Sequence, residues 1–120
     1  MSEKNSCADF EVFYRFLSKE EGGREKGIAF QGYRSDWLYD GDDPQKNGTY
    51  MIHPEFIDET GKPFEQNIFV PKEGTARMRI INTEMKSYHQ SRIKKGVKGY
   101  FVEGARKIAE ATVTKILYTA

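Results

Sequence analysis

FEVFYRFL, residues 10–17, decides the fold expected for this 120-residue chain. Every second residue from Phe10 to Phe16 is apolar and falls on one face, which is the two-residue period of a β-strand. Further extended segments are predicted at residues 28–39, 49–56, 67–70, 75–82, 99–103 and 107–117, separated by breaks rich in Gly, Pro and charged residues. The pattern predicts an all-β chain.

One segment departs from the strand pattern. Met85, Tyr88 and His89 follow the i, i+3, i+4 spacing of a helix face behind two possible N-caps, which predicts a short helix over residues 83–92. Several short strands and one helix favour a compact barrel as the architecture. The length suits a single domain, so we expect an N-terminal tail at 1–8 and one barrel at 9–120.

Composition narrows the class of protein. Residues 1–85 carry 11 basic and 16 acidic side chains, whereas residues 86–120 carry 8 and 2. The basic end is typical either of a surface for nucleic acid or an acidic partner, or of a solvated face balanced by acidic neighbours in the fold. We favour the solvated face, because dedicated duplex binders are usually more basic overall.

The same sequence indicates a cytoplasmic protein without a membrane segment. Cys7 is the one cysteine, which suggests a reducing compartment. No leader-like segment occurs, and no apolar run approaches the roughly 20 residues that cross a bilayer.

Motifs for catalysis, metals and nucleotides do not occur in the sequence. The two histidines and the cysteine lack a zinc-ligand spacing, and the acidic residues at 40–43 do not fit a calcium loop. There is also no phosphate loop or nucleophile elbow. We therefore predict no cofactor, no metal, no GTP binding and no catalytic residue. A small enzyme that pairs His89 with a distant carboxylate is the alternative.

Three stretches resemble a known family. LSKEEGGR at 17–24, GYR at 32–34 and VEGARKIAEATVTKIL at 102–117 are similar, in the same order, to the third, C-terminal β-barrel domain of bacterial translation elongation factor Tu. The terminal block aligns without a gap from Gly96 to Leu117. This resemblance implies a closed six-stranded antiparallel barrel of Greek-key type.

In the intact factor, that barrel helps to hold the T stem of aminoacyl-tRNA and meets the GTPase domain and the nucleotide-exchange factor. By resemblance, Arg24, Glu103 and Gly104 occupy retained T-stem-contact positions. Glu25 stands where the family usually has histidine and Asp36 where it has glutamine, so both add negative charge and weaken phosphate contact.

We therefore expect a non-enzymatic binding module with a translation-related protein partner; weak binding of tRNA or other RNA is the alternative. Aromatic or basic side chains are the further binding candidates: Tyr33, Arg34, Trp37, Arg92, Lys94, Lys95 and Lys98. For Arg24 and Arg34 we favour a structural role over a partner-facing one: they would tie loops to acidic neighbours such as Glu103 at one barrel end.

Overall fold

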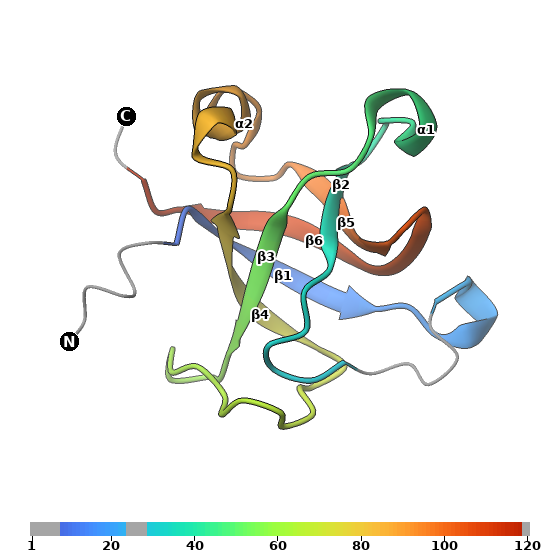
Figure 1. Cartoon of the computed structure of the whole chain (residues 1–120). Coiled ribbons are helices and arrows are strands. Elements are labelled where there is room, and N and C mark those ends of the chain that lie inside the picture. Colours follow the sequence, from blue (N-terminus) through green and yellow to red (C-terminus); the bar gives the residue numbers. More distant parts are fainter. Residues whose placement is uncertain (1–7, 24–28, 119–120) are drawn as a thin grey trace.

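The computed structural model describes residues 8–23 and 29–118 (Figure 1). Cys7, Arg24, Glu25 and most of the predicted tail lie outside these residues. The described elements are β1 (Phe10–Phe16), η2 (Lys19–Glu21), β2 (Asp36–Tyr39), α1 (Pro44–Asn47), β3 (Ile52–Ile57), β4 (Glu73–Ile80), η3 (Thr83–Met85), α2 (Lys86–Arg92), β5 (Lys98–Glu103) and β6 (Arg106–Ile116). The chain is mostly β, as its sequence predicts.

The six strands form one antiparallel sheet in the order β2-β5-β6-β1-β4-β3. The sheet curls into a half-barrel with β1 near its middle (Figure 1). At one point the two outer strands approach each other, because the backbones of Trp37 in β2 and Tyr50 just before β3 exchange hydrogen bonds of 2.8 and 2.9 Å. This bridge brings the two outer edges of the curled sheet together locally.

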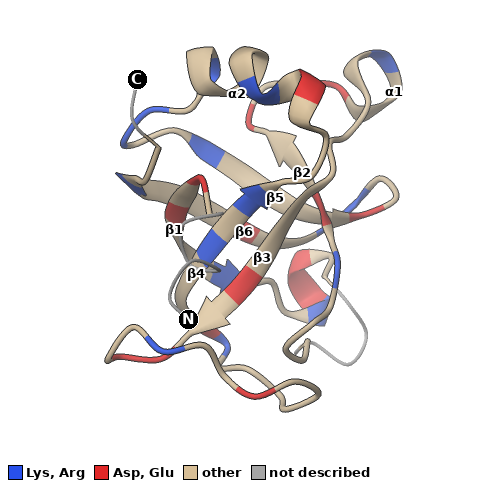
Figure 2. Ribbon diagram, turned by 60° about the vertical axis from the view of Figure 1, so that its left-hand side comes forward, with Lys and Arg blue, Asp and Glu red and all other residues tan. Residues whose placement is uncertain are grey.

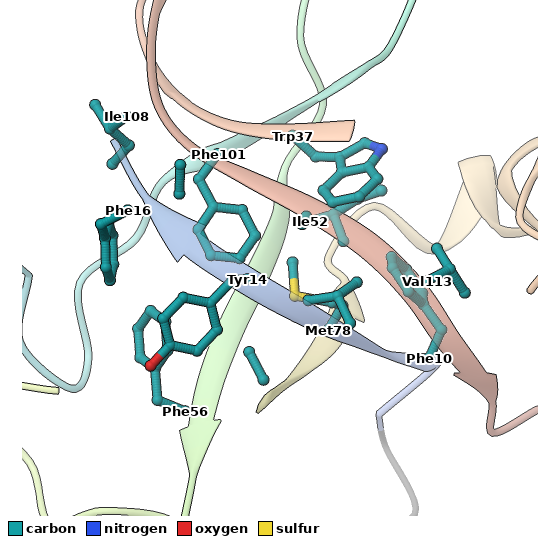
Figure 3. Close-up of a cluster of buried hydrophobic side chains, with 14 of the residues drawn as sticks. Phe10, Tyr14, Phe16, Trp37, Ile52, Phe56, Met78, Phe101, Ile108 and Val113 are labelled. Carbon is teal, nitrogen blue, oxygen red and sulfur yellow. The ribbon is translucent and has the colours of Figure 1, made fainter. Parts of the chain in front are cut away.

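The predicted inward face of β1 is confirmed. Phe10, Val12, Tyr14 and Phe16 are at most 1% exposed. The core residues that pack with them on the inner side of the curled sheet come from each of the other strands, as Figure 3 shows for Phe56 of β3 and Phe101 of β5. Burying an aromatic or aliphatic side chain of this size stabilises the fold by about 1.5–3 kcal/mol. The alternation in FEVFYRFL therefore supplies one wall of the core.

Trp37 belongs to this core and does not face a partner. Its side chain is 0% exposed, and its ring lies 5.7 Å from that of Phe10 and 5.8 Å from that of Tyr39. Gly99 of β5 makes room for the indole, since a Cβ atom there would lie 2.3 Å from Trp37 Cζ2. The predicted binding role of Trp37 is wrong, because its side chain is buried in the core, as are those of the next two residues, Leu38 and Tyr39.

Two predicted strands are shorter or missing. Residues 67–70 form no strand and make a single β-bridge, between Phe69 and Phe30. Within the described part of 28–39, the strand spans Asp36–Tyr39 only. The Gln31 backbone pairs with Asn67 and Ile68. Its buried side-chain amide also donates to the carbonyls of Phe56 and Phe64 and accepts from the Phe56 N–H, each at 2.9 Å.

The predicted helix at 83–92 is confirmed as η3 followed by α2. Asn82 begins it, because the Asn82 side chain accepts a hydrogen bond from the Glu84 N–H. The sequence did not predict α1, which starts at Pro44 with Asp43 as its N-cap. Neither helix, nor any other among the described residues, is long and apolar enough to span a membrane.

Candidate binding surface

Two of the three stretches that carry the resemblance meet at one contact. The Tyr33 hydroxyl donates a hydrogen bond to the Glu103 carboxylate, which joins the loop before β2 to the hairpin between β5 and β6. Gly104 turns this hairpin with a left-handed φ of 58°. The sequence predicted such a loop cluster with arginines as its ties. In the structure Tyr33 makes this tie, and Arg24 lies outside the described residues.

A cavity of about 430 Å³ opens beside these loops, on the outer face of β3 and β4. We call it the arginine cavity; its lining includes Gln31, Gly32, Arg34, His53, Glu55, Gln66, Arg77, Arg79 and Ile81. Strand pairing sets the order of its charges, because His53 lies opposite Arg79 and Glu55 lies opposite Arg77. Figure 2 shows these basic positions of β4 beside the acidic position of β3.

The arginines of the cavity differ in their partners. Arg77 forms an ion pair with Glu11 of β1, with 3.4 Å between Nε and Oε2. Arg34 and Arg79 are exposed and form no hydrogen bond or ion pair with any residue in the described ranges. The pKa of His53 is lowered, first by burial and then by Arg34 and Arg79. The cavity therefore has unpaired positive charge around a histidine.

An apolar patch lies on the two loops that supply Gln31, Gly32 and Gln66 to the cavity lining. We define the apolar patch as Phe30, Ile68 and Phe69, whose side chains are 37%, 49% and 74% exposed. The bridge between Phe30 and Phe69 holds the two loops together. These loops continue directly into the cavity wall, where Gly32 lies against Gln66. Ile81 also lines the cavity, and the Met51 carbonyl accepts its N–H.

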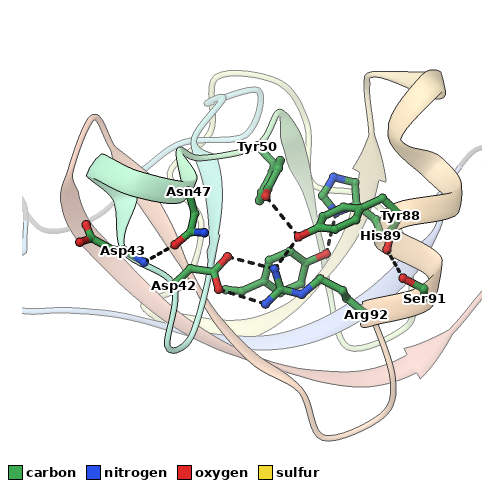
Figure 4. Close-up of polar contacts among 9 residues, drawn as sticks. Asp42, Asp43, Asn47, Tyr50, Tyr88, His89, Ser91 and Arg92 are labelled. Atoms are coloured by element: carbon green, nitrogen blue, oxygen red, sulfur yellow. Dashed lines mark hydrogen bonds and ion pairs between the residues drawn. The ribbon is translucent and has the colours of Figure 1, made fainter.

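A polar cluster holds α2 against the sheet (Figure 4). The Arg92 guanidinium donates to both carboxylate oxygens of Asp42, at 3.0 and 3.1 Å, and to the Tyr88 hydroxyl at 2.8 Å. It also lies 3.7 Å from the centre of the Tyr39 ring. Arg92 was predicted to face a partner, but these contacts place it in a tie between α2 and the loop after β2.

His89 lies next to Arg92 in the same cluster. It is 1% exposed, and its Nδ1 atom lies 2.6 Å from the Tyr39 hydroxyl. Burial, followed by the nearby Arg92 charge, lowers its pKa to about 4. The enzyme alternative required His89 beside a carboxylate in an open pocket, whereas the structure places it inside against a tyrosine. The prediction that the chain is not an enzyme stays a prediction.

The predicted lysines gather at a different place from the arginine cavity. Lys94 and Lys95 are exposed in the loop after α2, and Lys98 is exposed at the start of β5. Figure 1 places α2 at one end of the half-barrel, and the loops that carry Arg34 and the apolar patch at the other. The structure therefore separates the predicted cations into two surfaces.

Sequence reasoning missed the apolar patch, His53 and Arg79. The signal for the patch was present, because Ile68, Phe69 and Val70 form an unbroken apolar run without the alternation of a strand. Within the described ranges, no three His, Cys, Asp or Glu side chains gather as metal ligands. No protein-family model matches the sequence, and no curated protein matches it at a significant level.

Proposed function

We propose that this chain is a non-enzymatic binding module whose partner is a protein. We further propose that its six strands form a closed Greek-key barrel like the third domain of elongation factor Tu, as a mimic or accessory of that factor. The three similar sequence stretches support this relationship, as do the six antiparallel strands and the Trp37–Tyr50 bridge between the outer strands.

The exposure of Phe69 carries the proposal of a protein partner. A phenylalanine that is 74% exposed, beside two other exposed apolar side chains, leaves apolar area in water that a partner would cover. Covering such a side chain fully is worth about 1.5–3 kcal/mol. Because the Phe30–Phe69 bridge already orders the loops, little further ordering is needed when a partner binds.

RNA binding is the second candidate, and it has its own observation. Lys94, Lys95 and Lys98 are exposed at the α2 end and would attract phosphates. However, the Arg92 charge that was expected to join them is paired with Asp42. Affinity that depends on three exposed lysines should fall steeply with salt, whereas burial of the apolar patch should not.

A capture experiment separates these two functions. We would immobilise the wild-type chain, Phe69→Ser and Phe13→Ser, and recover bound protein and RNA from a nuclease-treated and an untreated cytoplasmic extract. Phe13 is the matched control, since it is 46% exposed on the outer face of β1. We expect one nuclease-resistant protein to be lost with Phe69→Ser and kept with Phe13→Ser.

Either of two results would contradict the proposal. Equal capture by all three chains would show that the apolar patch does not bind the partner. A nuclease-sensitive catch that weakens steeply with salt and disappears in Lys94→Glu/Lys95→Glu would establish RNA binding instead.

A further inference from the structure

We propose that the arginine cavity binds a carboxylate of the protein partner, so that the partner segment carries an acidic residue flanked by apolar side chains. This inference rests on the proposed protein-binding function and adds the chemistry of the partner. It depends on the charges of the cavity lining and on the apolar residues beside it.

The charge of the cavity matches one carboxylate. Arg34 and Arg79 are unpaired within the described ranges, Arg77 is paired with Glu11, and Glu55 contributes one negative charge to the same wall. With His53 neutral, the lining residues keep one positive charge, and the Asp36 carboxylate acts on His53 from outside the lining. Arginine guanidinium groups bind a carboxylate through two parallel N–H donors, which suits a single negative group entering the cavity.

The surroundings of the cavity favour a protein segment over a nucleic acid. A row of phosphates requires a row of cations, because each neutralised phosphate contributes to affinity. The exposed Ile68 and Phe69 instead lie on a loop that hydrogen-bonds to Gln31 of the lining, and Ile81 of the lining hydrogen-bonds to the exposed Met51. A segment with one carboxylate between apolar side chains fits both the charge and the apolar borders.

His53 provides a built-in reporter of an anion in the cavity. Arg34 and Arg79 lower the pKa of His53, and Asp36 raises it. A carboxylate beside the two arginines would offset their charge and raise the His53 pKa towards the ordinary range. His89 is the internal control, because it lies in the polar cluster under α2 and does not line the cavity.

The test is a titration of the full chain, followed by NMR of the two histidine rings. The probe is the acetylated and amidated tripeptide Leu-Glu-Phe, and the matched control is the neutral tripeptide Leu-Gln-Phe. We expect the glutamate peptide alone to raise the His53 pKa, with His89 unchanged. In Arg34→Gln/Arg79→Gln the His53 pKa should start higher, and the peptide should no longer change it.

Inorganic phosphate at equal ionic strength serves as a third probe. If phosphate raises the His53 pKa and the glutamate peptide does not, the cavity binds phosphate groups and the inference is overturned. The inference is also overturned if neither the glutamate peptide nor phosphate changes the His53 pKa. The same holds if both raise the His53 pKa in Arg34→Gln/Arg79→Gln as much as in the wild type.

Failure of this inference can be told apart from failure of the proposed function. If the captured protein binds Arg34→Gln/Arg79→Gln as tightly as the wild type but loses Phe69→Ser, the protein-binding function stands and the carboxylate site is wrong. If capture does not depend on Phe69, the proposed function fails, and the peptide titration still decides whether the cavity takes a carboxylate. We expect the double variant to weaken partner binding about tenfold, as is typical for the loss of a charged hydrogen-bonded pair.

Discussion

Replacing Gly99 with alanine should destabilise the fold through Trp37. The new Cβ atom would lie 2.3 Å from Cζ2, 2.6 Å from Cη2 and 2.7 Å from Cε2 of the indole, far inside the favourable carbon–carbon separation of about 3.5–4.0 Å. The indole has no free space to move into, because it is 0% exposed and contacts the rings of Phe10, Tyr39 and Phe101.

The size of the effect follows from two opposing terms. Overpacking a core position lowers the free energy of unfolding by about 1–3 kcal/mol. Loss of glycine's freedom in the unfolded chain returns about 0.4–1 kcal/mol. We therefore expect Gly99→Ala to lower stability by about 1–2 kcal/mol, which lowers the Tm by roughly 4 °C for each kcal/mol in a domain of this size.

Gly74→Ala is the matched control for this substitution. Gly74 also lies in a strand, but its added Cβ would lie 3.4 Å from the Tyr14 hydroxyl oxygen and 3.6 Å from two ring carbons, which is ordinary contact. Only the loss of glycine's freedom in the unfolded chain remains at this position, so Gly74→Ala should raise the free energy of unfolding by about 0.4–1 kcal/mol. Urea unfolding can be followed by the fluorescence of Trp37, the only tryptophan in the chain. Equal unfolding midpoints for the two variants, with unchanged Trp37 emission, would refute the packing of Trp37 against Gly99.

Two further predictions concern the polar cluster under α2. Because the pKa of His89 is lowered to about 4, the folded chain takes up a proton at this ring only near pH 4. In the unfolded chain His89 has its ordinary pKa of about 6.5 and is protonated below that pH. Stability should therefore decrease as the pH falls from about 6.5 to 4, by up to about 3 kcal/mol. Urea unfolding across this range should show a smaller decrease for His89→Gln, and an identical decrease would contradict the assignment. Arg92→Lys keeps the charge but loses the paired bonds to Asp42, so thermal unfolding should show a loss of about 1–2 kcal/mol. Lys95→Ala, at an exposed position, should change stability by less than about 0.5 kcal/mol. Equal effects of the two substitutions would show that the bonds from Arg92 to Asp42 do not stabilise the fold.

The elements with a sustained local period were predictable. The alternation at 10–17 gave both the strand and its buried face, and the spacing of Met85, Tyr88 and His89 gave the helix. Residues 67–70 misled the prediction because their apolar side chains are suitable for a strand. In the structure, residues 67–70 pair with the short loop at residues 29–31, which the Gln31 side chain ties to Phe56 of β3, so the pairing stays a single bridge.

The candidate site was less predictable than the fold. Tyr33, Arg34 and Glu103 were identified as site residues, and the structure brings Tyr33 to Glu103 and Arg34 to the arginine cavity. Trp37 and Arg92 have the residue types of binding surfaces, yet one is buried in the core and the other is paired with Asp42. Residue type alone does not show whether an aromatic ring or a cation is already satisfied within the protein.

The sequence by itself determined the elements with a sustained local period, such as β1 and α2, because that period is set by a few neighbouring residues. Only the tertiary structure decided that Arg34, His53 and Arg79 share one cavity, since they come from a loop and two strands. The register between β3 and β4 places His53 opposite Arg79, and the curl of the sheet brings β2 with its preceding loop to the same side. Such meetings depend on pairing between distant segments, which no local pattern of side chains specifies.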